Sequence, residues 1–260
     1  MRIVNQNLFF SIFLQKNLTR LAAYNQDVLC LQELSINKFK SIKSNPFQNF
    51  FAVSPTRAKK STVGILTKES PVDWGELHLN STGAIIDTVN PKLFDTVALW
   101  VDLKYGTEKL RIYSCYFQLD YIGFLERAAM LETVIEHSAG CKKVLIMGDM
   151  NTTIPEGKLN RFCNFVLHRN KLPSYADCAD FYLKNEKHFF NSRANASGFL
   201  DLLDLRCNTW RIPFTPVEAC SLKLDWAFQK NIENAEITLE SKTPWYLDHK
   251  TIIIDLADSQ

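Results

Sequence analysis

The chain has 260 residues, of which 46% are hydrophobic and 22% charged, and its formal net charge is +2. This composition excludes a disordered or fibrous chain and is typical of one large globular domain or two small ones. The near balance of charge argues against a broad nucleic-acid-binding face, although "KFKSIK" (38–43) and "RAKK" (57–60) are locally basic.

Short β-branched runs bounded by turn residues predict strands along the whole chain. In chain order they are residues 2–8, 27–34, 50–53, 62–68, 83–89, 96–103, 110–117, 143–149, 222–228 and 250–256. Apolar stripes at helical spacing predict helices over residues 14–25, 124–140 and 159–170. Many strands and few helices indicate two sheets packed face to face with helices outside. No repeat or linker divides the sequence, so we expect a single domain over residues 1–260.

The cysteines and the apolar segments indicate where in the cell the protein is expected. Seven cysteines, with no CxxC pair, indicate reduced thiols and not a disulfide framework or a zinc site. The apolar segment "LFFSIFL" (8–14) lacks the small-residue cleavage site of a signal peptide, and no run approaches the ~20 apolar residues of a membrane helix. We therefore expect a cytoplasmic protein without membrane contact.

Polar side chains suited to hard metal ions stand at the ends of several predicted strands. They are Asn7, Glu33, Asp149, Asn151, Asp225, Asp248 and His249. Mg²⁺ takes oxygen ligands in near-octahedral geometry, usually one or two carboxylates with water and substrate phosphate. Each residue alone also fits a polar strand end at a turn. Their occurrence together, in this order, favours a metal-dependent site.

The order of the motifs "NQNL", "LQE", "GDMN", "NTW", "KLDWAF" and "LDH" resembles the endonuclease/exonuclease/phosphatase superfamily of metal-dependent phosphoesterases, also described as DNase I-like. The resemblance runs from Asn7 to His249. It implies an α/β four-layer sandwich, with two mostly antiparallel β-sheets packed face to face, helices outside, and the site at one edge of the two sheets.

The resemblance also implies how the metal and the attacking water are held. Glu33 would be the principal Mg²⁺ ligand, supported by Asn7 and Asp248, with Mn²⁺ able to replace Mg²⁺. Asp149 would orient the attacking water and take its proton. Asn151 would hold that water or a phosphate oxygen.

Further residues would act on the substrate. His249, oriented by Asp225, would offer a proton or a hydrogen bond to the phosphoryl oxygen. Tyr116 would hydrogen-bond the scissile phosphate, with Gln118 as the alternative in a shifted register. Trp210 lies near the expected rim, where its ring would stack on a base.

Three positions depart from common family patterns. Gln6 stands where many members carry Trp before the Asn, which we expect to alter the packing under the metal site. Phe9 stands where some nucleases have an additional Asp, and Leu247 replaces the usual Ser before Asp-His. These differences argue against close kinship with the abasic-site endonucleases but remove no core catalytic group.

The function expected from these residues is a Mg²⁺-dependent phosphodiesterase that uses metal-assisted in-line attack by water. A nuclease acting on DNA or RNA is the leading hypothesis, with nucleic acid as substrate and no stable protein partner. The alternative is a phosphoesterase acting on a small-molecule or lipid phosphoester, which the near-neutral charge favours. A catalytically silent protein that keeps the fold is a third hypothesis, and the complete set of polar residues argues against it.

Overall fold

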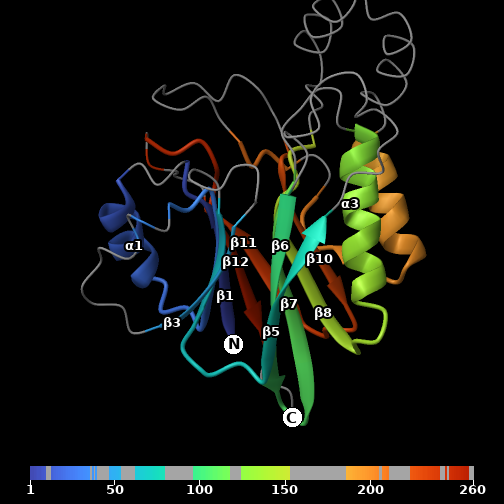
Figure 1. Cartoon of the computed structure of the whole chain (residues 1–260), viewed down its shortest axis with the longest axis horizontal. Coiled ribbons are helices and arrows are strands. Elements are labelled where there is room, and N and C mark those ends of the chain that lie inside the picture. The colour runs from blue at the N-terminus through green and yellow to red at the C-terminus, as the bar shows by residue number, and fades with distance from the viewer. Residues whose placement is uncertain are drawn as a thin grey trace, which may run out of the picture.

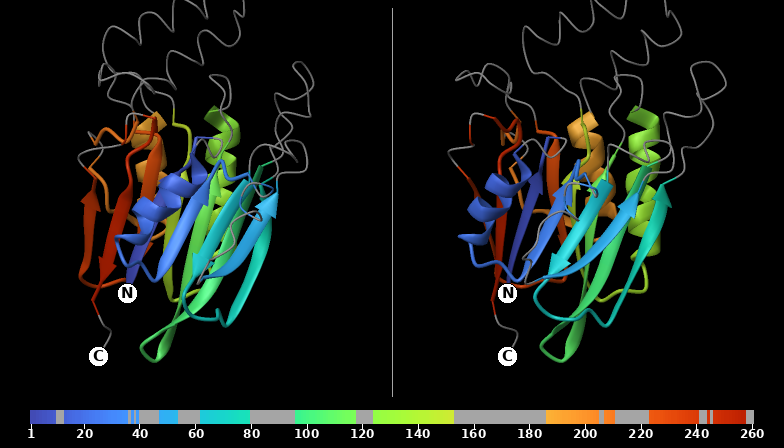
Figure 2. Two further views of the ribbon diagram at one scale, coloured as in Figure 1. Left: turned by 90° about the vertical axis from the view of Figure 1, so that its left-hand side faces the viewer. Right: turned by 60° about the vertical axis from the view of Figure 1, so that its left-hand side comes forward.

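The computed structural model describes residues 1–9, 13–35, 37, 39, 47–53, 62–79, 96–117, 124–152, 186–204, 207–210, 223–240, 244 and 246–257. Within these residues two six-stranded β-sheets lie face to face, and helices cover both outer faces (Figure 1, Figure 2). The expected four-layer α/β sandwich is confirmed. The predicted strand 83–89 and helix 159–170 lie outside the described residues, as do Gln118 and the basic cluster 57–60.

The first sheet joins the two ends of the chain. Its strand order is β11 (Ala235–Leu239), β12 (Ile252–Leu256), β1 (Arg2–Asn7), β2 (Val28–Gln32), β4 (Thr62–Thr67) and β3 (Gln48–Val53). Only the central pair, β1 and β2, is parallel, and the helix α1 (Leu14–Ala22) connects it. The other four pairs are antiparallel.

The second sheet repeats this scheme. Its strand order is β5 (Asp73–Leu79), β6 (Thr96–Tyr105), β7 (Glu108–Tyr116), β8 (Lys143–Asp149), β10 (Asp225–Lys230) and β9 (Leu200–Asp201). The central pair, β7 and β8, is again parallel and is connected by α3 (Phe124–His137). A further helix over residues 186–196 lies beside α3 on the outer face (Figure 1). Each sheet therefore contains one β–α–β unit at its centre.

Alternating side chains along the strands give each sheet two buried faces. In the first sheet, Ile3 and Val28 pack into the core between the sheets. Their neighbours Val4 and Leu29 point to the other side, where they pack with Leu14 and other residues of α1. The second sheet buries its outer face in the same way under α3 and residues 186–196. The central strands are buried on both faces because both faces of each sheet are covered there.

The structure also contains strands that the sequence pattern did not predict. β5, β9 and β11 all lie at sheet edges, next to a single partner. β5 reads "DWGELHL" and mixes poor strand formers with exposed positions, so its pattern was not typical of a strand. The predicted helices 14–25 and 124–140 are confirmed but end earlier, at Ala22 and His137. No helix among the described residues is long and apolar enough to span a membrane.

Candidate active site

The two parallel strand pairs bring four polar side chains to one edge of the sandwich. Asn7 ends β1 and Glu33 follows β2, while Tyr116 ends β7 and Asp149 ends β8. The C-terminal ends of parallel strands lie at the same edge of a sheet. Two hydrogen bonds then cross between the sheets. The Nδ2 of Asn7 donates to Oδ2 of Asp149 at 2.9 Å, and the Tyr116 hydroxyl donates to Oε1 of Glu33 at 3.0 Å.

The backbone at these strand ends adopts conformations that most residues avoid. Glu33 and Asn151 are in the left-handed region, with φ of 54° and 50°. Gly148, directly before Asp149, has φ of 139°, and a Cβ atom there would lie 2.1 Å from the carbonyl oxygen of Cys115. Only glycine fits at this position. Such strained backbone is often found where side chains must be aimed at a functional site.

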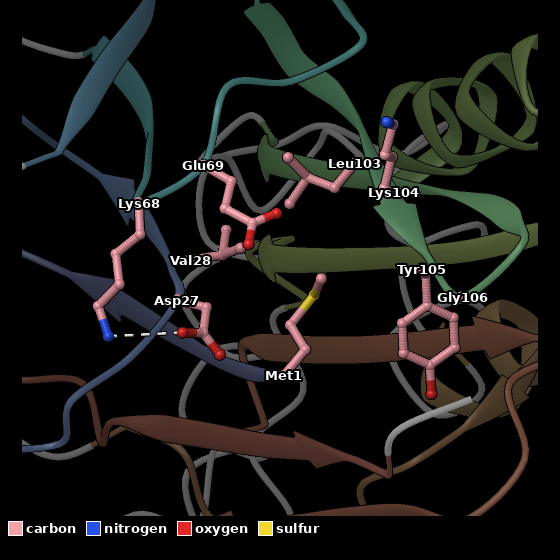
Figure 3. A pocket seen from close by; sticks show the side chains of 9 residues that line it. All are labelled: Met1, Asp27, Val28, Lys68, Glu69, Leu103, Lys104, Tyr105 and Gly106. Atoms are coloured by element: carbon pink, nitrogen blue, oxygen red, sulfur yellow. Dashed lines mark hydrogen bonds and ion pairs between the residues drawn. The ribbon is translucent and has the colours of Figure 1, made fainter. Parts of the chain in front are cut away.

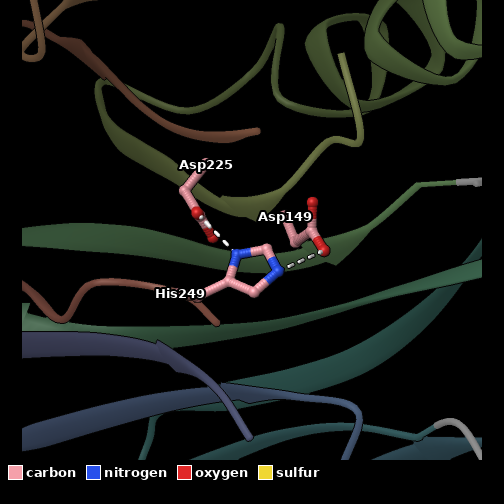
Figure 4. A group of neighbouring side chains, drawn as sticks. All are labelled: Asp149, Asp225 and His249. Carbon is pink, nitrogen blue, oxygen red and sulfur yellow. Dashed lines mark hydrogen bonds and ion pairs between the residues drawn. The ribbon is translucent and has the colours of Figure 1, made fainter. Parts of the chain in front are cut away.

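His249 lies among three carboxylates, two of which, Asp149 and Asp225, are drawn on either side of its ring in Figure 4. Its Nδ1 is 2.8 Å from Oδ2 of Asp225, the first residue of β10. Its Nε2 is 3.7 Å from Oδ2 of Asp149 and 3.8 Å from Oδ2 of Asp248. All four side chains are buried. The imidazole is therefore oriented by Asp225 and presents Nε2 toward the other carboxylates.

The segment "NTW" frames this group. The hydroxyl of Thr209 accepts a hydrogen bond from the backbone N–H of Asp225 at 3.0 Å. The backbone carbonyl of Thr209 accepts one from the N–H of Lys250 at 2.8 Å. The indole of Trp210 donates to Oδ2 of Asp248 at 3.4 Å. Thr209 thus fixes the backbone on both sides of the imidazole. No role of Thr209 was predicted from the sequence, although the "NTW" motif indicated this segment.

Burial and mutual repulsion shift the protonation of these groups. Burial raises the pKa of Asp149 to about 8. The charge of His249 opposes this increase, and the charges of Asp225 and Glu33 add to it. Burial alone would lower the pKa of His249. The carboxylates of Asp225, Asp248 and Asp149 outweigh this effect and raise the pKa of the imidazole well above its usual value. The site therefore favours an imidazolium that neutralises part of the surrounding negative charge.

Glu33, Asp248 and Asn7 fit a divalent cation. Burial raises the pKa of Glu33. The charge of His249 opposes this increase, and the charge of Asp248 adds to it. Burial also raises the pKa of Asp248, and its Oδ1 is buried with no hydrogen-bond partner among the described residues. Two buried carboxylates are costly unless a cation compensates them. Carboxylate and amide oxygens are the ligands that Mg²⁺ takes in proteins.

A second group of ligand atoms is less suited to a metal. Single ligand atoms of Asp149, Asp225 and His249 lie within 4.8 Å of one another. The hydrogen bond between Nδ1 of His249 and Asp225 already occupies one ligand atom of each. This group is therefore better arranged to hold and move a proton than to bind a cation.

Of the site residues predicted from the sequence, all that lie within the described part of the chain are at this one edge. They are Asn7, Glu33, Tyr116, Asp149, Asn151, Trp210, Asp225, Asp248 and His249. The backbone N–H of Asn151 donates to Oδ1 of Asp149 at 3.0 Å, and its side-chain Nδ2 donates to the carbonyl of Phe117 at 2.8 Å. The catalytic roles assigned to these residues stay predictions.

A separate pocket of about 330 Å³ lies at the other end of the sandwich (Figure 3). It opens between the starts of β1 and β2 and the turn between β6 and β7, and its lining includes Met1, Val28 and Tyr105. An ion pair between Lys68 and Asp27, 3.4 Å apart, lies at its rim. None of the nine site residues lines this pocket.

Comparisons with known proteins give the same fold. The structure is similar to that of a functionally unknown conserved protein from Enterococcus faecalis V583, with 16% sequence identity, a TM-score of 0.66 and coverage of 100% of both chains. It is also similar to D. rerio TDP2 complexed with single strand DNA product (14% identity, TM-score 0.60, 98% of this chain and 97% of that one). A third similar structure is the human Nocturnin catalytic domain with bound sulfate anion (15% identity, TM-score 0.61, coverage of 100% of this chain and 94% of that one). At these identities the likeness shows the fold alone.

A comparison with family models shows which family the chain belongs to, which the shared fold alone does not. Among curated proteins no sequence matches the chain. The model of the Endonuclease/Exonuclease/phosphatase family matches residues 13–217, which is most of the chain. This span includes Glu33 and Asp149, and the structure brings Asn7 and His249 to them from outside it. Members of this family are hydrolases that act on phosphoesters. The chain belongs to the endonuclease/exonuclease/phosphatase family.

Proposed function

We propose that the protein is a divalent-metal-dependent phosphodiesterase that uses Mg²⁺, or Mn²⁺ in its place, to cleave strands of DNA or RNA. The observation that carries this proposal is the meeting of the Glu33 and Asp248 carboxylates with Asp149 and the His249–Asp225 pair at one edge. In-line attack of water on a phosphodiester needs a base for the water and positive charge around the phosphate.

Asp149 is the base in this scheme. Its two oxygens accept hydrogen bonds from Asn151 and Asn7, which hold the carboxylate in one orientation. Burial in the protein alone raises its pKa and so favours the protonated form. A divalent cation bound by Glu33, Asp248 and Asn7 would polarise the phosphate and favour the ionised form of neighbouring carboxylates. The Asp149 carboxylate would then orient the water and take its proton.

His249 acts on the phosphate. Asp225 holds the proton-bearing Nδ1, so Nε2 is free to donate a hydrogen bond or a proton toward a phosphoryl oxygen as negative charge develops there. The hydroxyl of Tyr116 donates its single proton to Glu33 in the structure, and we propose that it turns to donate to the phosphate when substrate binds. Asn151 and Trp210 complete the proposed substrate contacts, the first with the phosphate and the second with a base.

Nucleic acid is the substrate class that the comparisons favour. One structure with the same fold, that of D. rerio TDP2, is a complex with a single strand DNA product. The test is incubation of the purified protein with plasmid DNA, single-stranded DNA and RNA in Mg²⁺, with EDTA and an Asp149→Ala variant as controls. We expect cleavage that EDTA abolishes and added Mg²⁺ restores.

The same assay separates the alternatives. Hydrolysis of bis-p-nitrophenyl phosphate or a lipid phosphoester, with no cleavage of nucleic acid, would favour the small-molecule or lipid phosphoesterase. No metal-dependent turnover of any phosphoester would overturn the proposal. We further propose that residues 1–260 form one domain, because β1 and β12 are neighbours in one sheet. The cytoplasmic location and the lack of a stable protein partner stay predictions.

A further inference from the structure

Gln6 lies directly behind the site, on the outer face of the first sheet. Its neighbours in β1, Asn5 and Asn7, point between the sheets, so Gln6 points under α1, and it has no exposed surface. Its Oε1 accepts a hydrogen bond from Nη2 of Arg20 at 2.9 Å and lies 2.6 Å from the hydroxyl of Thr251. Because both groups can donate, the carboxamide oxygen must face them and the NH₂ group must face the other way.

The NH₂ group of Gln6 joins two site residues that are far apart in the sequence. Its Nε2 donates to the carbonyl of Asn7 at 2.7 Å and to the carbonyl of His249 at 3.2 Å. One rigid, planar group thus sets the spacing between the two main chains. Asn7 is a proposed metal ligand, and His249 is the proposed donor to the phosphate.

The carboxamide is itself held by a buried network. Nη1 of Arg20, on α1, donates to Oε2 of Glu240 at 2.6 Å. The Thr251 hydroxyl lies 2.6 Å from the same carboxylate oxygen, and the Tyr24 hydroxyl donates to the other oxygen at 2.6 Å. Arg20 and Glu240 are both largely buried. The position of Gln6 therefore depends on α1 and on the chain that follows β11.

We propose that Gln6 is a positioning residue for the phosphodiesterase site, and this inference rests on the proposed function. It fixes the main chains of Asn7 and His249 relative to each other and links their placement to the docking of α1. Among side chains of this size, only a carboxamide presents an acceptor to Arg20 and two N–H donors to the two carbonyls. A carboxylate would place an oxygen against both carbonyl oxygens, and an apolar side chain would remove the hydrogen bonds that Gln6 makes with the two carbonyls and with Nη2 of Arg20.

The test compares Gln6→Met, which keeps the length of the side chain, and Gln6→Glu, which keeps its shape, with wild type. We expect kcat to fall about 10- to 100-fold, because small displacements of reacting groups have effects of that size, while KM stays within about twofold. Hydrogen exchange of the backbone amides in residues 246–251 should become faster in both variants. Tyr24→Phe is the matched control, since it removes a hydrogen bond at the far end of the same network and should keep kcat.

Two outcomes overturn the proposal. One is a folded Gln6→Met protein with kcat within twofold of wild type, and the other is an equal loss of kcat in Tyr24→Phe, which would indicate general loosening. If the wild type cleaves no phosphodiester, the proposed function fails, and the exchange rates still test the positioning. If both Gln6 variants fail to fold, NMR of wild type decides: we expect slowly exchanging Gln6 carboxamide protons, and exchange as fast as in exposed glutamines overturns the proposal.

Discussion

The Asp149 carboxylate is held from both sides, since the backbone N–H of Asn151 reaches Oδ1 and the Asn7 side chain reaches Oδ2. The imidazole of His249 is held from one side only, by Asp225, which leaves Nε2 facing the site. These contacts restrict each side chain to one orientation. The acid–base assignment proposed above follows from this difference, because a base needs a fixed oxygen and a donor needs an available N–H.

Asp149→Ala and His249→Ala test that assignment directly. We expect each substitution to lower kcat by about 10²–10⁴, the usual contribution of a general acid or base. The double variant should lose less than the product of the single losses, because both groups serve one step. His137→Ala is the control, since this histidine contacts Tyr113 on the outer face of the second sheet. Near-normal rates in either site variant would show that the roles are misassigned.

Gly148 is the residue whose replacement should damage the fold most at this edge. Gly148→Ala would bring Cβ to 2.1 Å from a backbone oxygen of Cys115 at a φ of 139°. We expect the free energy of unfolding to fall by at least about 3 kcal/mol, measured by urea denaturation. Gly140→Ala is the matched control, because nothing lies within 4 Å of its added Cβ, and its change should stay within about 1 kcal/mol. Equal effects at both positions would contradict the backbone geometry described here.

At the scale of elements, β6 and β7 are joined by a buried ion pair as well as by their backbones. Asp102 and Arg111 are directly opposed in the two strands. The guanidinium donates to both carboxylate oxygens, from Nε at 2.6 Å and from Nη2 at 2.9 Å, and lies 4.0 Å from the ring of Trp100. Burial would raise the pKa of Asp102, but the hydrogen bonds and charges of Arg111 and Lys109 outweigh this effect, and the pKa is lowered.

The stability that this pair contributes should depend on pH. Because the folded pKa of Asp102 lies below the unfolded value of about 3.9, the contribution is present above that value and is lost as pH falls through the folded pKa. We expect Asp102→Asn to lower the free energy of unfolding by about 1–3 kcal/mol at pH 7. Urea denaturation at pH 7 and at a series of acidic pH values would measure this. A difference that does not shrink at low pH would show that the ion pair is not its source.

The elements that carry the site were predictable from the sequence, and so was the edge strand β3, but the edge strands β5, β9 and β11 were not. β1, β2, β7 and β8 are apolar runs that end in polar residues, and both features are local. β5 and β11 pair on one side only and expose part of their side chains, so their patterns are weak. The role of Gln6 was missed because its partners Arg20 and His249 come from remote parts of the chain, and no local pattern reports such contacts.

At the scale of the whole molecule, the site lies between two β–α–β units that belong to different sheets. Glu33 follows the parallel pair of one unit and Asp149 ends the pair of the other. Sequence motifs could name these residues, but their meeting depends on how the two sheets face each other. Beneath them, Nε2 of Gln32 bonds Oδ1 of Asn5 at 2.8 Å and the Ser114 hydroxyl of the opposite sheet at 2.9 Å. Buried polar contacts therefore align the sheets at this edge.

A divalent cation should stabilise the whole fold, because it would bind the folded carboxylates and relieve their repulsion. At a free Mg²⁺ concentration of 100 times its Kd, the expected gain is about 2.7 kcal/mol. Thermal unfolding in Mg²⁺ and in EDTA measures this gain, and calorimetry gives the Kd. Glu33→Gln should abolish most of the response and weaken Mg²⁺ binding. A wild-type Tm that is the same in both buffers would count against a metal at this edge.

The pairing of β1 with β12 joins two segments that are remote in the sequence, as the register of Val4 with Ile253 shows. Asn7 ends β1 and His249 lies shortly before β12, so this one ladder links the metal side of the proposed site to its imidazole. If the ladder opened, Glu33 and Asp149 would keep their places beside β2 and β8, while His249 would lose its place beside Asn7. The proposed hydrolysis should therefore fail before the rest of the molecule unfolds.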